Sequence, residues 1–306
     1  MERLIDDFVS SLNRRDTTKE TFRKALREFS KWAGSAKPEA LGQDDIQRYK
    51  DYILSKNLSP TSMSAYLTAV RRFYDYLVSR DMTAENPARK IKGAARPEKH
   101  LTPPLTRGEL ERLLASADDP SPIGKRDLAI LSLMALAGLS EIEIVRADLG
   151  DVVRKEGRTA VYVQGKNKDK KDEYVTLSAP ASAALHDYIR ARGGSRAGEP
   201  LFWGIGNRAV GGRITTRGVR ARVNHYLDVS GLRGKGIKPL SLRHTAALLA
   251  IAEGATVSDI KRMMHLKTTE SALVYFEEAK ELLKEYIVEP ARARGRTAQR
   301  PYAFSM

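Results

Sequence analysis

The chain has 306 residues, enough for two domains that each bury a hydrophobic core. Its formal net charge of +15 is shared, because Lys and Arg outnumber Asp and Glu both in residues 1–100 and in residues 101–306. Positive charge on both halves predicts a polyanionic partner that the protein wraps, whereas a basic tail alone would leave one half neutral. The chain has no cysteine, which excludes disulfides, thiolate nucleophiles and Cys-ligated zinc.

Residues 1–92 predict four helices, each with apolar residues at helical spacing. The second is expected to begin with a capping box at Thr17 and Glu20 and to end at Gly34. The fourth is expected to begin after Ser59, which has the residue type of an N-cap.

Two arginines of the fourth predicted helix, Arg71 and Arg72, fall outside its apolar stripe. They are predicted to lie on phosphate groups of the partner, with solvated arginines as the alternative. Residues 93–104 then lose the helical periodicity and contain three prolines, which predicts an exposed linker before a second domain at 105–290. The remaining residues, 291–306, predict a basic tail.

The second domain is predicted to combine helices with a little strand. Thr106 and Glu109 form a capping-box pattern, and the apolar run 128–139 predicts a buried helix. That run is about half of the ~20 residues that cross a bilayer, so no membrane contact and a cytoplasmic location are expected. Two β-rich runs, 159–164 and 173–177, flank a lysine-rich turn and predict a β-hairpin. Further helices are expected near 180–192, 216–229, 242–253, 256–264 and 278–289.

Residues 207–243 are the densest positive segment, with a single acid, Asp228, among their lysines and arginines. A surface that only kept the protein soluble would mix both signs, so this block predicts a surface that follows a phosphate backbone. The predicted contacts to that backbone are Arg213, Arg217 and Arg220 in the block and Lys168 in the hairpin turn.

An ordered series of motifs follows the block. Leu242-Arg243-His244-Thr245 precedes an apolar helix, a second helix that ends at His265, and the segment Leu273-Val274-Tyr275-Phe276. Together with LTRGELERLL, GLSEIEI and the QGKNK hairpin, this series closely resembles the C-terminal half of the tyrosine recombinases, the family of phage integrases and Xer-type resolvases. The N-terminal helices look like the core-binding domain of that family, so the resemblance covers nearly the whole chain.

The resemblance implies a mainly α fold with a small β-sheet: an N-terminal SAM-like four-helix core-binding domain and a C-terminal α+β catalytic domain. It implies a site-specific DNA recombinase or integrase that binds double-stranded DNA as a homotetramer on two sites, with an accessory DNA-bending protein as a further partner. The location implied is nucleoid-associated. Strand exchange through a 3′-phosphotyrosyl bond conserves bond energy, so neither a cofactor nor a metal is implied.

Four residues match the catalytic positions of the family. Tyr275 matches the nucleophile, a phenol whose ordinary pKa of about 10 has to be overcome near neutral pH. Arg243 matches the arginine whose planar guanidinium can hold a phosphate through two hydrogen bonds. Lys166 matches the hairpin lysine that protonates the leaving oxygen, and His265 is assigned to the phosphate site.

Each of these assignments has a simpler alternative. Tyr275 is one of 12 tyrosines, most of which are core or surface residues. Arg243 could form a structural salt bridge at a helix start, although a cation there is unfavourable without a nearby anion. Lys166 has other lysines beside it, and His265 could simply end a helix.

The sequence departs from the family pattern at two positions. Ser140 stands where the family has an arginine after Gly-Leu, and with Glu143 it forms a capping box that explains it without DNA. Leu240 stands where the family has a histidine. The alternative function is therefore a catalytically impaired DNA-binding regulator or architectural protein, and a relaxing nuclease-ligase like the type IB topoisomerases is a third hypothesis.

Overall fold

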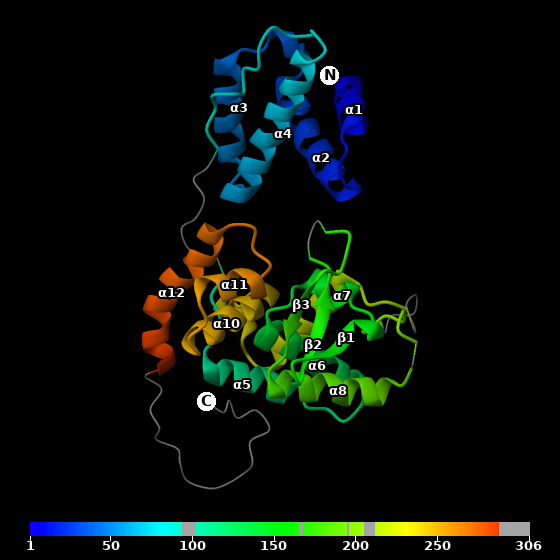
Figure 1. The fold of residues 1–306 in the computed structure, drawn as a ribbon. Coiled ribbons are helices and arrows are strands. Elements are labelled where there is room, and N and C mark those ends of the chain that lie inside the picture. Colours follow the sequence, from blue (N-terminus) through cyan, green and yellow to red (C-terminus); the bar gives the residue numbers. More distant parts are fainter. Residues whose placement is uncertain (94–101, 166–167, 195, 205–211, 288–306) are drawn as a thin grey trace. The chain divides into compact units, whose positions relative to one another are not determined.

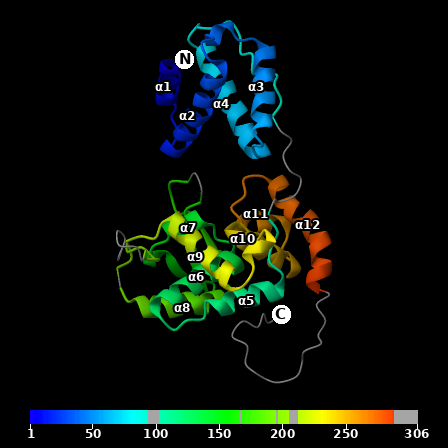
Figure 2. The same ribbon diagram turned by 180° about the vertical axis from the view of Figure 1, so that it is seen from behind.

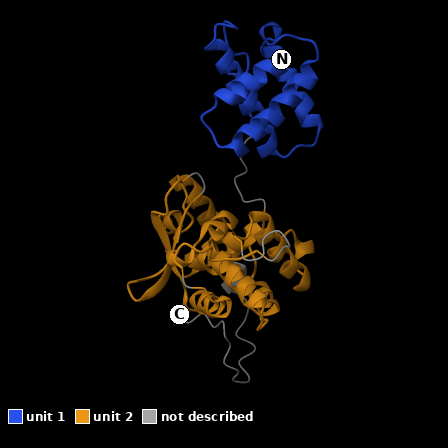
Figure 3. Ribbon diagram, turned by 90° about the vertical axis from the view of Figure 1, so that its right-hand side faces the viewer, with its two compact units in different colours: residues 1–97 blue, residues 98–306 orange. Residues whose placement is uncertain are grey.

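The computed structural model describes residues 1–306 except 94–101, 166–167, 195, 205–211 and 288–306, and it describes no side chains in 283–287. The chain forms two compact units, Met1–Pro97 and Glu98–Met306, which Figure 3 colours separately. None of the helices in the described part is long and apolar enough to span a bilayer. The predicted tail and most of the predicted linker lie outside the described residues.

Unit 1 is the predicted four-helix bundle (Figure 1). Its helices enclose a core rich in aromatic side chains, among them Phe29, Tyr49 and Phe73. The elements are α1 (Glu2–Ser11), α2 (Asp16–Ala33), the short 3₁₀ helix η1 (Pro38–Ala40), α3 (Gln43–Ser55) and α4 (Pro60–Val78).

The ends of these helices test the predicted caps. Ser59 caps α4, because its hydroxyl accepts a hydrogen bond from the backbone N–H of Ser62, and Gly34 ends α2 with a positive φ of 60°. The prediction for the start of α2 was wrong: the helix begins at Asp16, with Arg15 as the flanking residue, so Thr17 is already helical. The carboxylate of Asp16 in the first turn favours this earlier start, since it complements the helix dipole.

Unit 2 combines helices with one sheet. Figure 1 shows the sheet, and Figure 2, from behind, shows α9 on the other side of the unit. Its helices are α5 (Arg107–Ser116), α6 (Pro122–Ala137), α7 (Glu141–Arg146), α8 (Ala179–Arg192), α9 (Thr216–Val229), α10 (Pro239–Ala252), α11 (Val257–Met263) and α12 (Thr269–Ile287), with 3₁₀ turns η2 (Leu149–Asp151) and η3 (Arg233–Lys235). The buried helix α6 packs against α8 and α10 and forms the centre of the core.

The sheet has three antiparallel strands in the order β1 (Val152–Lys155), β2 (Arg158–Val163) and β3 (Glu173–Thr176). The predicted hairpin is β2 and β3, with Val161 opposite Val175. Strand β1 was not predicted, since it is only four residues long and lies mostly half-buried.

The last helix also differs from the prediction. We expected a helix near 278–289 and a short helical segment that carries Tyr275, but the structure has one continuous helix, α12, which runs from Thr269 and places Tyr275 in its interior. The Thr268 hydroxyl accepts a hydrogen bond from the Ser271 N–H and so satisfies a backbone donor at the helix start.

Candidate active site

A cavity of about 910 Å³ opens in unit 2 where α7, the β2–β3 hairpin, α10 and α11 meet. The residues that line it include both positive and negative side chains. Among them are Ser140, Glu143, Lys168, Glu173, Arg243 and His265. The structure therefore brings together two of the four predicted catalytic residues, Arg243 and His265, with the departed position Ser140.

Glu143 is the central residue of this cavity and is only 2% exposed. Its carboxylate accepts hydrogen bonds from the N–H and hydroxyl of Ser140 (2.7 and 2.8 Å), from Arg243 (3.0 Å) and from Nδ1 of His265 (2.9 Å). Burial alone would raise the pKa of Glu143, but the hydrogen bond with His265 and the charge of Arg243 outweigh it and lower the pKa to about 2. Glu143 is therefore a carboxylate that orients both Arg243 and His265.

Arg243, near the start of α10, is held by three acceptors. Nη1 donates to the carbonyl of Gly138 and to Glu143, and Nη2 donates to the carbonyl of Met264. Gly138 has the left-handed φ of 70° that ends α6, and a Cβ there would approach the Met264 sulfur to 3.0 Å. The predicted alternative for Arg243, a salt bridge at a helix start, is thus present, and it fixes the guanidinium at the cavity wall.

His265 follows α11 in an unusual backbone conformation. Its φ of 47° is left-handed, and the N–H groups of His265 and Leu266 donate to the carbonyls of Arg262 and Lys261, which closes the helix end. Glycine normally takes this position, because a side chain there costs about 1 kcal/mol. The conformation directs the imidazole to Glu143 on one side, while Nε2 lies 3.8 Å from Glu173 on the other.

Tyr275 does not line the cavity. It is 5% exposed and lies in a small apolar cluster with Ala247, Ile260 and Met264, and its ring packs edge-on against His244 at 5.6 Å. Burial raises the pKa of its phenol to about 12, although the charge of Arg243 lowers it in part. The phenol therefore lies within the electrostatic influence of Arg243 but is kept neutral and away from solvent.

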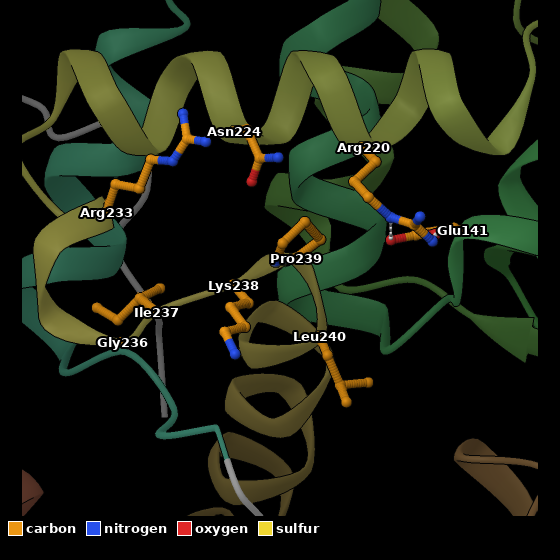
Figure 4. A pocket seen from close by; sticks show the side chains of 9 residues that line it. All are labelled: Glu141, Arg220, Asn224, Arg233, Gly236, Ile237, Lys238, Pro239 and Leu240. Carbon is orange, nitrogen blue, oxygen red and sulfur yellow. Dashed lines mark hydrogen bonds and ion pairs between the residues drawn. The ribbon is translucent and has the colours of Figure 1, made fainter. Parts of the chain in front are cut away.

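The two departed positions border the cavity differently. Ser140 caps α7 and binds Glu143, so its predicted structural role is present. Leu240 is 52% exposed and lies on the rim of this cavity and of a second one, which Figure 4 shows. Neither residue supplies a positive charge.

The predicted phosphate contacts of unit 2 fall into separate groups. Lys166 lies outside the described residues. Lys168 lines the cavity and forms ion pairs with Asp172 and Glu173. Arg213 has a structural role, since it donates to the carbonyls of Val145 and Ala147 and pairs with Asp148. Arg217 and Arg220 are exposed on α9, and Arg220 forms two hydrogen bonds with Glu141.

The two arginines of α4 in unit 1 also differ. Arg71 donates to the carbonyls of Ala88 (3.3 Å) and Ile91 (2.9 Å), so it ties the segment after α4 to that helix. Arg72 is exposed. The sequence pattern placed both off the apolar stripe and could not separate them, because the acceptors of Arg71 lie about 20 residues further along the chain.

Sequence reasoning missed the roles of two carboxylates. Glu143 was recognised only as a capping residue, and Glu173 was not singled out. Glu143 contacts Arg243 and His265, and Glu173 lies near His265; each of these pairs is more than 90 residues apart in the sequence, so only the folded arrangement shows the contacts. Lys261 and Lys267 also line the cavity and were not predicted.

Comparison with known proteins shows which family this fold belongs to. The model of the phage integrase family matches residues 104–281, and that of the phage integrase N-terminal SAM-like domain matches residues 2–84. The tyrosine recombinase XerD of Pseudomonas aeruginosa is 27% identical over 292 residues, which cover 92% of this chain and 95% of the relative. XerC of Thermodesulfovibrio yellowstonii is 29% identical and covers 88% of each chain.

Solved structures agree with this fold. The XerH recombinase bound to its difH substrate has a TM-score of 0.71 at 17% identity, covering 88% of this chain and 78% of XerH. A lambda integrase fragment bound to a core site has a TM-score of 0.71 at 13% identity, covering 97% and 98%. The family models together match both units, and the predicted mainly α fold with a SAM-like domain and a small sheet is confirmed. The chain therefore belongs to the phage integrase family of tyrosine recombinases, whose members carry out site-specific DNA recombination.

Proposed function

We propose that this protein cleaves and rejoins double-stranded DNA with Tyr275 as the nucleophile. The phenolic oxygen attacks a backbone phosphorus, the bond from phosphorus to the 5′-oxygen breaks, and a 3′-phosphotyrosyl bond and a free 5′-hydroxyl result. That hydroxyl later attacks the phosphotyrosyl bond of a partner strand and releases the tyrosine. The observation that carries the proposal is the cavity that brings Arg243 and His265 together. The positive charge of Arg243 also reaches Tyr275, where it lowers the pKa of the phenol in part.

Arg243 has the capacity to hold the phosphate. A guanidinium has five N–H donors, and three hydrogen bonds to described residues leave two, the number that a bidentate phosphate contact requires. Glu143 holds the guanidinium in place while its negative charge stays buried. When its ring is protonated, His265 donates from Nε2 to the same phosphate while Nδ1 keeps its hydrogen bond with Glu143, and Lys166 protonates the leaving 5′-oxygen.

Tyr275 has to leave its apolar cluster before it can react. Its burial and its pKa of about 12 keep the phenol neutral. Movement of the N-terminal half of α12 would bring the ring from His244 towards Arg243, whose positive charge favours the phenolate. DNA binding is the event that we expect to accompany this movement, because the bound phosphate is the group that the phenol attacks.

The partner is duplex DNA, and the working assembly is a homotetramer on two sites, with an accessory DNA-bending protein as a further partner. The solved XerH and lambda integrase structures, which contain DNA substrates or sites, support the DNA partner. Exposed cations on both units, such as Arg72 and Arg217, support contact with both. A nucleoid-associated location in the cytoplasm follows from this partner.

The test is a covalent trap. The protein is incubated with a duplex that contains its own recombination site, found in the DNA beside its gene, with a nick next to the cleavage position so that the 5′ product diffuses away. We expect a protein–DNA adduct that survives denaturation and is absent in Tyr275→Phe. Tyr188→Phe removes a phenol that is also buried in unit 2 and should leave the adduct intact. No adduct from the wild-type protein would overturn the proposal.

Ser140 and Leu240 favour a second function, a DNA-binding regulator that does not cleave. The N–H and the hydroxyl of Ser140 both donate to Glu143, and the side chain of Leu240 has no hydrogen-bonding group. Loss of one donor from a preorganised anion site typically costs about 2.7 to 4 kcal/mol in the transition state. Specific DNA binding without any adduct would support this alternative.

A further inference from the structure

A second cavity of about 510 Å³ lies beside the first. Its walls are the exposed side of α9, the turn after η3 and the start of α10. Figure 4 shows Arg220 and Asn224 extending from α9 and Lys238 from the segment before α10. The side chain of Leu240 belongs to the walls of both cavities.

The charge of this second cavity is positive. Three cations line it, Arg220, Arg233 and Lys238, against one carboxylate, Glu141, which leaves a balance of 3 − 1 = +2. Glu141 is engaged by Arg220 at 3.1 and 2.5 Å, which fixes that guanidinium on the wall. The exposed Lys238 has no hydrogen bond or ion pair from its ammonium group to any described residue. An anion that enters the cavity therefore gains a contact with Lys238 without breaking one.

Leu240 is an apolar side chain shared by the walls of two cavities that are lined by cations. The side chain of Leu240 is 52% exposed and lines both cavities, so it is accessible to a strand that occupies them. Along a DNA strand, phosphates alternate with deoxyribose rings, whose carbon face is apolar, and successive phosphates advance about 3.4 Å along the helix axis. A leucine between two cationic cavities has the chemistry to contact such a ring.

We propose that the second cavity binds the backbone phosphate next to the one that is cleaved, on the same strand. Lys238 is its principal donor, Asn224 of α9 is a second polar group of the cavity wall, and Leu240 packs on the deoxyribose between the two phosphates. This inference rests on the proposed function, since it takes the first cavity as the site of the cleaved phosphate. Leu240 stands where the family has a histidine, and the inference gives this leucine a role in positioning the DNA strand.

The experiment tests which lysine contacts which phosphate. A series of duplexes carries one neutral methylphosphonate each, at successive linkages around the cleavage position, and binding of each is measured for the wild type, Lys238→Ala and Lys235→Ala. Lys235 is a matched control, because it lies three residues away, is exposed and pairs with Glu109 outside the cavity. We expect the neutral linkage next to the cleaved one to weaken binding about tenfold in the wild type and in Lys235→Ala, but less than twofold in Lys238→Ala.

The salt dependence gives a second readout. Loss of one phosphate contact reduces the slope of log K against log salt concentration by about 0.9, so Lys238→Ala should show this reduction when the natural duplex is used. If Lys238→Ala remains as sensitive as the wild type to the neutral linkage at every position, the inference is wrong. A Tyr275-dependent adduct would still form in that case, whereas its absence in the wild type would defeat the proposed function itself.

Discussion

Replacing Glu143 by Gln tests whether a buried carboxylate holds the site together. The change keeps the shape of the side chain but removes its charge, and it leaves Arg243, whose side chain is 13% exposed, without its counter-ion. A fall in the pKa of Glu143 from 4.5 to about 2 corresponds to about 3 kcal/mol of folding stability. Because the folded pKa is lowered, this contribution is present above pH 4.5 and is lost as the pH falls through 2. We therefore expect Glu143→Gln to be about 3 kcal/mol less stable at pH 7 and to approach the wild type near pH 2.

Urea unfolding between pH 2 and pH 7 measures this difference. The chain has two tryptophans, Trp32 in unit 1 and Trp203 in unit 2, so a Trp32→Phe background lets fluorescence report on unit 2 alone. Glu277→Gln, which removes an exposed carboxylate, is the control and should follow the wild type across the whole range. If the curves of Glu143→Gln and the wild type run parallel from pH 7 to pH 2, the carboxylate is not linked to folding and the reasoning fails.

Three further predictions add or remove a charge at other positions. Ser140→Arg should speed adduct formation about 10²-fold by adding a phosphate donor and cost about 1 kcal/mol of stability through the lost cap; an unchanged rate would mean that another cation already supplies the charge. Arg71→Ala should destabilise unit 1 by about 1.5 to 3 kcal/mol, because two carbonyls lose a charged donor. Arg72→Ala should leave the urea midpoint unchanged and weaken DNA binding. Equal midpoints for the two variants would contradict the structural role of Arg71. Glu173→Gln should tighten DNA binding about fourfold at low salt, from the ~0.8 kcal/mol between unit charges about 5 Å apart in water, and a difference that persists at high salt would exclude this electrostatic cause.

Local signals predicted most of the helices. Ser59 and Thr106 marked helix starts because an N-cap hydroxyl satisfies a backbone N–H within its own turn, and that information lies within four residues of sequence. Helix α9 was predicted with its observed bounds. The early start of α12 was missed, since its first turn combines Thr, Glu and Ser without an apolar stripe.

The chemistry of the candidate site was predictable only in part. Arg243 and His265 were singled out from the ordered series of motifs, and the structure brings both within 2.9 to 3.0 Å of one carboxylate; their roles remain predictions. The identity of that carboxylate depends on contacts across more than 90 residues, which periodicity does not encode. The burial of Tyr275 could not be predicted from the sequence either. The pattern around a tyrosine in an apolar segment is the same whether its hydroxyl faces a cavity or a hydrophobic cluster.

If Tyr275 is the nucleophile, as proposed, its buried resting position also limits cleavage of unrelated DNA. An enzyme that cuts DNA without hydrolysing ATP has no energy-consuming step at which binding to unrelated DNA could be rejected. If the reactive oxygen is stored out of reach, collisions with unrelated DNA leave the chromosome intact, and a strand is opened only after the helix that carries the tyrosine has been displaced. Under the proposed function, the packing of the Tyr275 ring beside His244 would keep the nucleophile away from DNA until the complex has assembled.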